Sequence, residues 1–274
     1  MKLAHALLPL IVASSTAFSS VITFDNSAAF DAQFPTATRS AVGGASQVSL
    51  LSGPSRVNLH AQETSSDTAG PASMTIFSTS SSDYDFISSS KTIEFNNVGF
   101  AYASTGATYS GILGVFSNTS ASGTGATDDG VYFLIDRGGS RLRFMERYNG
   151  NVFLRSEWTG LGTNPNAYSF SSMSMTLSAT GWTVSATSLT GSTYSNTGLF
   201  TNGTSALTWN SSNWGTSFYL GLEAQQTLGT LDTARYLDLS VQSITAVPEP
   251  GSIALLTLGG SLMTLAWLRR RRQA

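Results

Sequence analysis

Paired carboxylates give this 274-residue sequence its clearest capacity for acid–base chemistry. Glu146 and Glu157 flank an Asn-Gly dipeptide, and Asp83 and Asp85 stand two residues apart. Cleavage of a glycosidic bond needs two carboxylates placed across a groove. Glu146 and Glu157 face each other only loosely in a hairpin, so the pattern favours salt bridges on a solvated sheet face. We expect Glu146 to find its partner among Arg143, Arg147 and Arg155.

A nucleophilic or metal-assisted mechanism has less support. His60 is the one histidine beyond the first twenty residues, and a triad or a lyase would have to combine it with Arg56 or Tyr84. A lone histidine on a strand face is more often satisfied by its neighbours than used as a base. No Gly-x-Ser-x-Gly elbow, phosphate loop or dinucleotide fingerprint is present. The sequence therefore predicts no enzyme activity and no catalytic residues.

An acidic pair and two tryptophans remain as candidate binding residues. Asp128 and Asp129 could offer oxygen ligands to a structural Ca²⁺, but the segment lacks the length of a dedicated loop and favours an acidic turn. We expect no other metal or cofactor. Trp209 and Trp214 lie in an Asn- and Ser-rich segment and could stack on sugar rings, although core packing is the usual fate of tryptophan in a sandwich.

The composition is typical of an exported β-rich protein. Hydrophobic residues make up 41% of the chain, which is enough for a packed core, while charged residues make up only 11%. Polarity comes instead from 44 Ser and 33 Thr, with 26 Gly and no Cys. The absence of cysteine excludes disulfides, thiolate zinc sites and cysteine nucleophiles. Residues 20–247 carry fifteen carboxylates against nine Lys and Arg, so nucleic-acid binding is not expected.

The N-terminus has the three parts of a secretory signal. Lys2 precedes a short apolar stretch from Leu3 to Ala13, which is followed by small residues. Small residues at the −3 and −1 positions would permit cleavage after Ala17 or after Ser19. We therefore predict a signal peptide over residues 1–19 and export through the Sec translocon.

The C-terminus combines a possible cleavage motif with a membrane segment. Val247-Pro248-Glu249-Pro250 precedes an uncharged stretch from 251 to 268, which at a helical rise of 1.5 Å per residue would be roughly 27 Å long, enough to cross a bilayer. The prolines favour an extended, accessible backbone before this segment. Four arginines then follow, and they predict a cytoplasmic end by the positive-inside rule: Arg269, Arg270, Arg271 and Arg272.

This order of motif, apolar helix and arginine cluster resembles the PEP-CTERM family of sorting signals. The resemblance covers residues 247–274 and includes all three parts of the signal. It implies processing by an exosortase, a membrane-embedded cysteine protease and transpeptidase, in a Gram-negative bacterium that makes extracellular polysaccharide. A plain anchor that is never cut would need only the apolar stretch and the arginines.

The body, residues 20–246, shows apolar–polar alternation with a period of two and no convincing helical periodicity. The best-supported feature is a hairpin in which 141–147 and 152–158 flank the Asn149-Gly150 turn. Val131–Ile135 reads as a central strand that leads into it. Further strands are expected at Ser55–Ala61, Ser73–Phe77, Lys91–Phe95, Gly99–Ala103, Gly111–Phe116, Met173–Leu177, Trp182–Ala186, Phe218–Ala224 and Arg235–Ile244.

So many closely spaced strands predict an all-β antiparallel sandwich. Their order is similar to the concanavalin/laminin-G type of jelly roll, and a parallel β-helix is the main alternative, although no repeat supports it. We expect an exported protein that passes through an inner-membrane precursor to the cell surface or extracellular matrix. Its body would serve structure or adhesion with exopolysaccharide; a lectin-like module is the alternative, and a polysaccharide-active enzyme is third.

Overall fold

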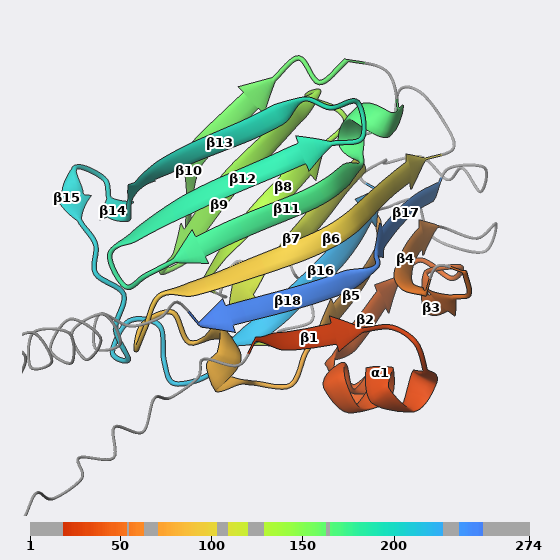
Figure 1. The fold of residues 1–274 in the computed structure, drawn as a ribbon, viewed down its shortest axis with the longest axis horizontal. Helices are drawn as coiled ribbons and strands as arrows, with labels where there is room; N and C mark the ends of the chain where they lie inside the picture. Colours follow the sequence, from red (N-terminus) through yellow and green to blue (C-terminus); the bar gives the residue numbers. More distant parts are fainter. Residues whose placement is uncertain are drawn as a thin grey trace, which may run out of the picture.

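Two antiparallel sheets packed face to face form the body of the protein (Figure 1). The computed structural model describes residues 19–53, 55–62, 71–102, 109–119, 129–162, 165–226 and 236–248. The all-β prediction is confirmed, and the β-helix alternative is wrong because the strands pair in antiparallel sheets.

The larger sheet has nine strands with β6 near its centre. One edge of β6 pairs with β11, which continues to β12 and β13. The other edge pairs with β18 along its first half and with β17 along its second, and these two lead to β1 and to β4–β3. The strands are β1 (Ser20–Thr23), β3 (Gln47–Leu51), β4 (Arg56–Gln62), β6 (Lys91–Tyr102), β11 (Phe170–Leu177), β12 (Gly181–Ser188), β13 (Thr193–Leu199), β17 (Tyr236–Val241) and β18 (Ser243–Pro248).

The smaller sheet has seven strands in the order β10-β9-β8-β7-β16-β5-β2. Its members are β2 (Arg39–Val42), β5 (Ala72–Phe77), β7 (Tyr109–Phe116), β8 (Gly130–Asp136), β9 (Arg141–Tyr148), β10 (Asn151–Thr159) and β16 (Tyr219–Gln226). A two-stranded ribbon of β14 (Thr201–Asn202) and β15 (Ser205–Ala206) lies beside the sandwich. The short helical elements are α1 (Ser27–Gln33), η1 (Thr36–Thr38), η2 (Ser82–Tyr84) and η3 (Pro165–Tyr168).

The core lies between the two sheets and consists of the inward side chains of alternating residues. Phe95 on β6 and Met175 on β11 face Phe133 on β8 and Leu222 on β16 within one continuous buried cluster. Burial of this apolar area is the main favourable term for folding. The chain has no disulfide to add to it, because it has no cysteine.

The predicted hairpin is confirmed at its turn and at both strands. Asn149 and Gly150 have φ angles of 53° and 77°, which is the left-handed pair of a type I′ turn. Tyr148 pairs directly with Asn151, so only two residues connect β9 and β10. This turn sets the register of β9 and β10 from the Tyr148–Asn151 pair to the Met145–Leu154 pair.

Several boundaries differ from the sequence-based expectation. The two strands predicted at 91–95 and 99–103 form one long strand, β6, and the single strand predicted at 235–244 is divided at Gln242 into β17 and β18. The expectation of no helix is wrong at α1, where the Asn26 side chain accepts a hydrogen bond from the Ala29 amide and caps the first turn. Seven residues are too few for a helical period to show in the sequence.

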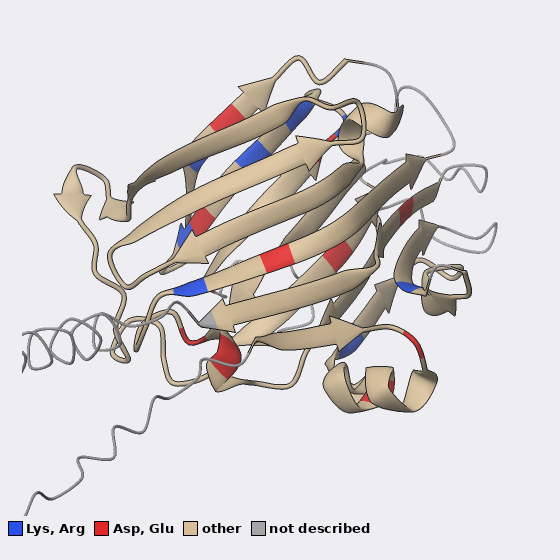
Figure 2. Cartoon of the chain, in the orientation of Figure 1, with Lys and Arg blue, Asp and Glu red and all other residues tan. Residues whose placement is uncertain are grey.

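Charge is distributed unequally over the two sheets, as Figure 2 shows. The strands of the nine-stranded sheet contain four Asp, Glu, Lys and Arg residues, whereas those of the seven-stranded sheet contain nine. Strands β11, β12 and β13 contain none. The two outer faces therefore offer different chemistry to a partner.

The outer face of the seven-stranded sheet carries a second apolar cluster, which needs glycine beneath it. Its buried members are Phe77, Ile112, Phe116, Tyr132 and Met145. A Cβ on Gly114 would lie 2.4 Å from both the Tyr132 Cβ and the Val131 carbonyl oxygen. A Cβ on Gly221 would lie 2.6 Å from the Phe116 ring.

We predict that Gly114→Ala destabilises the protein by about 1–3 kcal/mol, since the added methyl meets backbone that cannot rotate away. Ser110→Ala, on the same strand and partly exposed, should change stability by less than about 0.5 kcal/mol. Urea unfolding monitored by fluorescence measures both. Equal stability of the two variants would contradict the close packing at Gly114.

Candidate functional site

A buried polar cluster lies on the outer face of the seven-stranded sheet. Glu223 on β16 stands opposite Thr75 and Ile112 in register and is almost fully buried. Burial raises the pKa of its carboxyl group to about 7, and the nearby Arg147 guanidinium opposes this shift. Burial likewise raises the pKa of Tyr132, which is hydrogen-bonded to Arg147. Glu223 and Glu146 are the two carboxyl groups of the described residues whose pKa is raised to about 7, and Glu223 is the one on the outer face.

An ion-pair network occupies one end of the same face. Glu157 Oε1 accepts hydrogen bonds from Arg141 Nη1 at 3.0 Å and from Arg143 Nε at 3.4 Å. Asp136 Oδ2 lies 3.6 Å from Arg143 Nη1 and 3.8 Å from Arg141 Nε. The hydrogen bond from Arg141 is the main reason that the pKa of Glu157 is lowered. Both carboxylates are bound by guanidinium groups and are therefore poorly placed to exchange protons with a substrate.

Glu146 lies on the opposite, inner face of the sheet. Its side chain is 0% exposed, and its carboxylate accepts a hydrogen bond from Arg155 Nε at 2.5 Å. Arg155 also donates from Nη1 to Thr201 Oγ1 at 2.8 Å, which ties β10 to β14. Burial raises the pKa of Glu146 to about 7, although Arg155 acts against this. The expected pairing with Arg155 is confirmed, whereas the expected solvated setting is wrong.

A β-bulge explains why Glu146 and Glu157 cannot share a groove. Leu154 pairs with Met145 and Ser156 pairs with Phe144, so Arg155 is an extra residue in β10. The extra residue turns Glu157 to the outer face beside Arg143, while Glu146 stays inside. The two carboxylates that could suggest a glycosidase thus lie on opposite sides of one sheet.

The other predicted candidates are engaged in local structure. Asp85 accepts hydrogen bonds from the backbone amides of Ile87 and Ser88 after η2. His60 Nδ1 lies 2.9 Å from Asp238 Oδ1, as expected for a satisfied histidine. Tyr84 is buried in the core, away from the strand face that His60 occupies.

The proposed calcium site gains no support from the described residues. Asp129 Oδ1 accepts a hydrogen bond from the Asn149 amide and so belongs to the hairpin turn. Asp128 lies outside the described residues. Within the described ranges, no group of acidic or histidine side chains could hold a metal ion.

Trp209 and Trp214 require a correction, because both are buried in the core. Their exposed fractions are 1% and 4%, and their rings pack edge to face with centroids 4.8 Å apart. Phe86 and Phe218 complete the cluster around Trp214. Neither indole has a free face on which a sugar could stack, so the possible sugar-binding role is wrong and the core packing usual for tryptophan in a sandwich is confirmed.

We predict that Trp209→Ala lowers the free energy of unfolding by about 3–5 kcal/mol, as for other large buried aromatics. Leu154→Ala, at a half-exposed site on β10, should cost less than about 1 kcal/mol. Guanidinium titration measures both values. If Trp209→Ala kept full stability and lost only sugar binding, the indole would be a ligand platform after all.

The cluster around Glu223 was missed by sequence reasoning. Strands 111–116 and 131–135 are continuous apolar runs, and such runs indicate a strand that is covered on both faces. The apolar runs therefore indicated a covered outer face. They do not show which polar residue of the neighbouring strand lies in the cluster on that face. Only the register of β16 against β7 brings Glu223 into the cluster.

The sorting motif continues directly from the sandwich. Val247 and Pro248 are the last residues of β18, where they pair with Thr92 and Lys91 of β6. Strand β18 therefore extends two residues past the predicted end of the body at 246. On its other edge, Ala246 pairs with Ser20 at the start of β1. Glu249, Pro250 and Arg269–Arg272 lie outside the described residues.

The profile of the PEP-CTERM protein-sorting motif matches residues 246–272. The chain carries a PEP-CTERM sorting motif. No helix within the described ranges is long and apolar enough to cross a bilayer. The predicted span at 251–268 is not among the described residues. No curated protein matches this chain by sequence.

Lectins are among the solved structures with a similar architecture. Peanut lectin superposes with a TM-score of 0.51 at 12% identity, covering 84% of this chain and 97% of its own. Lectin I-B4 from Griffonia simplicifolia gives a TM-score of 0.50 at 10% identity, covering 84% and 98%. At such identities the likeness shows the fold alone, and it confirms the jelly-roll sandwich.

Burial of Glu223 predicts an unusual pH dependence of stability. The folded pKa of about 7 lies above the ordinary value of 4.5, so between these pH values the folded state binds more protons than the unfolded state. Stability should therefore fall as the pH rises from about 4.5 to about 7, by on the order of 3 kcal/mol.

Glu223→Gln should remove the part of the loss that comes from Glu223, while Glu146, whose folded pKa is also about 7, keeps a contribution of similar size. Glu94→Gln on the other sheet controls for net charge. Thermal unfolding between pH 4 and pH 8 measures the effect. An identical pH profile for Glu223→Gln and the parent would show that Glu223 is ionised in the folded state.

Proposed function

We propose that the chain is the precursor of an exported surface protein whose C-terminal tail is processed by an exosortase. Residues 1–19 direct export through the Sec translocon, and the tail holds the precursor in the inner membrane until it is cut. The mature protein then reaches the cell surface or the extracellular matrix of a Gram-negative cell. The observation that carries this proposal is the sorting motif that continues without a linker from β18.

The body acts in this proposal as a non-enzymatic adhesive or structural domain associated with exopolysaccharide. The positions of the carboxylates support a body without glycosidase activity. Glu146 and Glu157 lie on opposite faces of the sheet. Asp136 and Glu157 are bound by arginines. A lectin-like carbohydrate-binding module is the second candidate. It is favoured by the sandwich shared with peanut lectin, a likeness that extends over 84% of the chain.

We predict that the mature protein recovered from its own host ends within Val247–Pro250 and lacks Arg269–Arg272. Intact mass spectrometry measures both ends at once. Glu249→Ala should cause the precursor to accumulate, because it alters the motif itself. Glu94→Ala removes a carboxylate from the body and should be processed like the parent. A mature species that retains the arginines would reduce the tail to a permanent anchor.

A further inference from the structure

The outer face of the nine-stranded sheet is a regular array of hydroxyl groups on β11, β12 and β13. The outward positions of these three strands are Ser or Thr except for Gly181 and Leu199, which pair with each other at one end, and the inward positions on β11 and β12 are buried. We call this array the hydroxyl face; it comprises Ser172, Ser174, Thr176, Thr183, Ser185, Thr187, Thr193, Ser195 and Thr197. Strand pairing sets its spacing at about 4.8 Å across strands and about 6.8 Å along them.

Neighbouring hydroxyls of this face orient one another. Thr183 Oγ1 lies 2.9 Å from Thr197 Oγ1, and Thr176 Oγ1 lies 2.7 Å from Thr92 Oγ1 on β6. Thr197 Oγ1 also donates to the Trp182 carbonyl oxygen at 3.0 Å, so Thr183 is the donor to Thr197 and the pair keeps acceptor sites for a partner. The face is therefore an ordered set of hydrogen-bonding groups.

The charge of the face points to a neutral partner. Strands β11–β13 contain no charged residue, and Glu94 is the one charged residue where the array continues onto the outward side of β6. An anionic polymer or membrane needs Lys and Arg for binding. A second protein chain usually buries an aromatic or aliphatic centre, which a Ser and Thr array does not provide.

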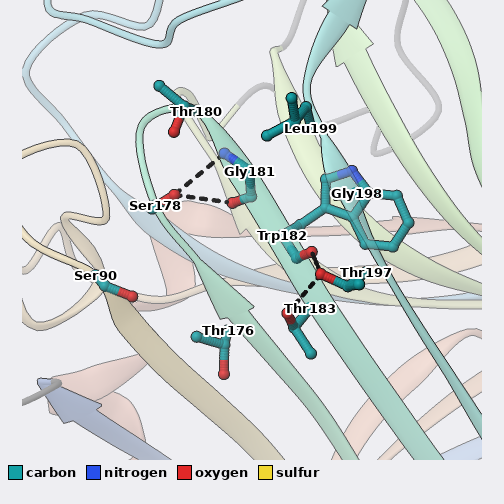
Figure 3. A pocket seen from close by; sticks show the side chains of 10 residues that line it. All are labelled: Ser90, Thr176, Ser178, Thr180, Gly181, Trp182, Thr183, Thr197, Gly198 and Leu199. Atoms are coloured by element: carbon teal, nitrogen blue, oxygen red, sulfur yellow. Dashed lines mark hydrogen bonds between the residues drawn. The ribbon is translucent and has the colours of Figure 1, made fainter.

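A shallow hollow lies at one end of the hydroxyl face and has an apolar side chain at its margin. It has a volume of about 230 Å³ and lies at the β11–β12 turn, where Ser178, Thr180, Thr183 and Thr197 surround it (Figure 3). Leu199, which is 65% exposed, lies at its margin. Hydroxyls beside one aliphatic side chain suit a sugar ring, which has polar edges and an apolar C–H face.

Individual surface hydrogen bonds contribute little net free energy, so a single sugar would be held weakly. A polymer that presents hydroxyls repeatedly along its length makes many such contacts at once, and its affinity rises through multivalency. The extent of the face over three strands fits a chain and not a monosaccharide.

We infer that the hydroxyl face binds a neutral polysaccharide chain, with the hollow at the β11–β12 turn receiving one of its sugar units. This inference rests on the proposed surface function and assigns the adhesive role to one face. It differs from binding through Trp209 and Trp214, which lie in the core.

The test measures co-sedimentation of the full chain, purified in mild detergent, with insoluble cellulose, insoluble mannan and calcium alginate beads. We expect retention on a neutral polymer, weak retention on alginate, little effect of added salt and no displacement by free glucose or mannose. Ser174→Ala, Ser185→Ala and Ser195→Ala combined should weaken retention roughly tenfold.

Ser185→Arg should abolish retention, because it places a long charged side chain at the centre of the face. Leu154→Arg is the matched control on the outer face of the other sheet and should bind as the parent does. Thermal unfolding checks that each variant is folded.

Loss of retention in Leu154→Arg but not in Ser185→Arg would overturn the assignment and place binding on the other sheet. Self-association of the parent in sedimentation velocity, abolished by Ser185→Arg, would assign the face to a second copy instead. No retention of the parent on either neutral polymer would also overturn the inference. None of these results alters the mass of the processed C-terminus, so the proposed sorting is tested separately.

Discussion

The insertion of β17 and β18 beside β6 is the constraint on which the nine-stranded sheet depends. One edge of β6 is completed by β11, but the other edge has no partner until residues 236–248 are in place. The same segment connects β1, β4 and β3 to the rest of the sheet. Pairing between such distant parts of the sequence carries a large loop-closure cost, so this sheet is expected to close late. The last described strand thus completes the fold.

This constraint also limits where the sorting motif can be cut. Val247 and Pro248 belong to β18, so removal of residues upstream of them would take away a central strand. A protease that acted within β18 would have to separate it from β6 on one side and β1 on the other. A cut at the far end of the motif leaves the sheet intact. The position of the motif therefore allows a cut that leaves the body folded. A cut only a few residues nearer the N-terminus would remove part of β18.

Much of the fold could be predicted because it depends on local patterns. Alternation located most of the strands, and the Asn149-Gly150 pair specified the hairpin and its turn type. The candidate site was harder to predict, because it depends on which face of the sheet each side chain occupies. A single extra residue at Arg155 turns Glu157 to the outer face, and no local pattern in the sequence marks that bulge.

The burial of individual polar residues could not be predicted from the sequence either. Alternation shows that Glu223 shares a face with Tyr219 and Gly221, but not that this face is covered. The same limit applies to Trp209 and Trp214, because an Asn- and Ser-rich segment looks exposed until it folds over an aromatic cluster. Tertiary packing decides these cases, and local composition does not.

The pairing of Ser20 with Ala246 relates the hydroxyl face to the sorting motif. These residues are direct partners, so the first strand begins and the sorting motif starts at the same end of the nine-stranded sheet. The β11–β12 turn with its hollow lies at that end too, because Leu177 pairs with Lys91, which is also the partner of Pro248. From there the hydroxyl face extends along β11, β12 and β13 toward the opposite end of the sheet. A polysaccharide chain that follows these strands would therefore run from the end that carries the sorting motif toward the far end.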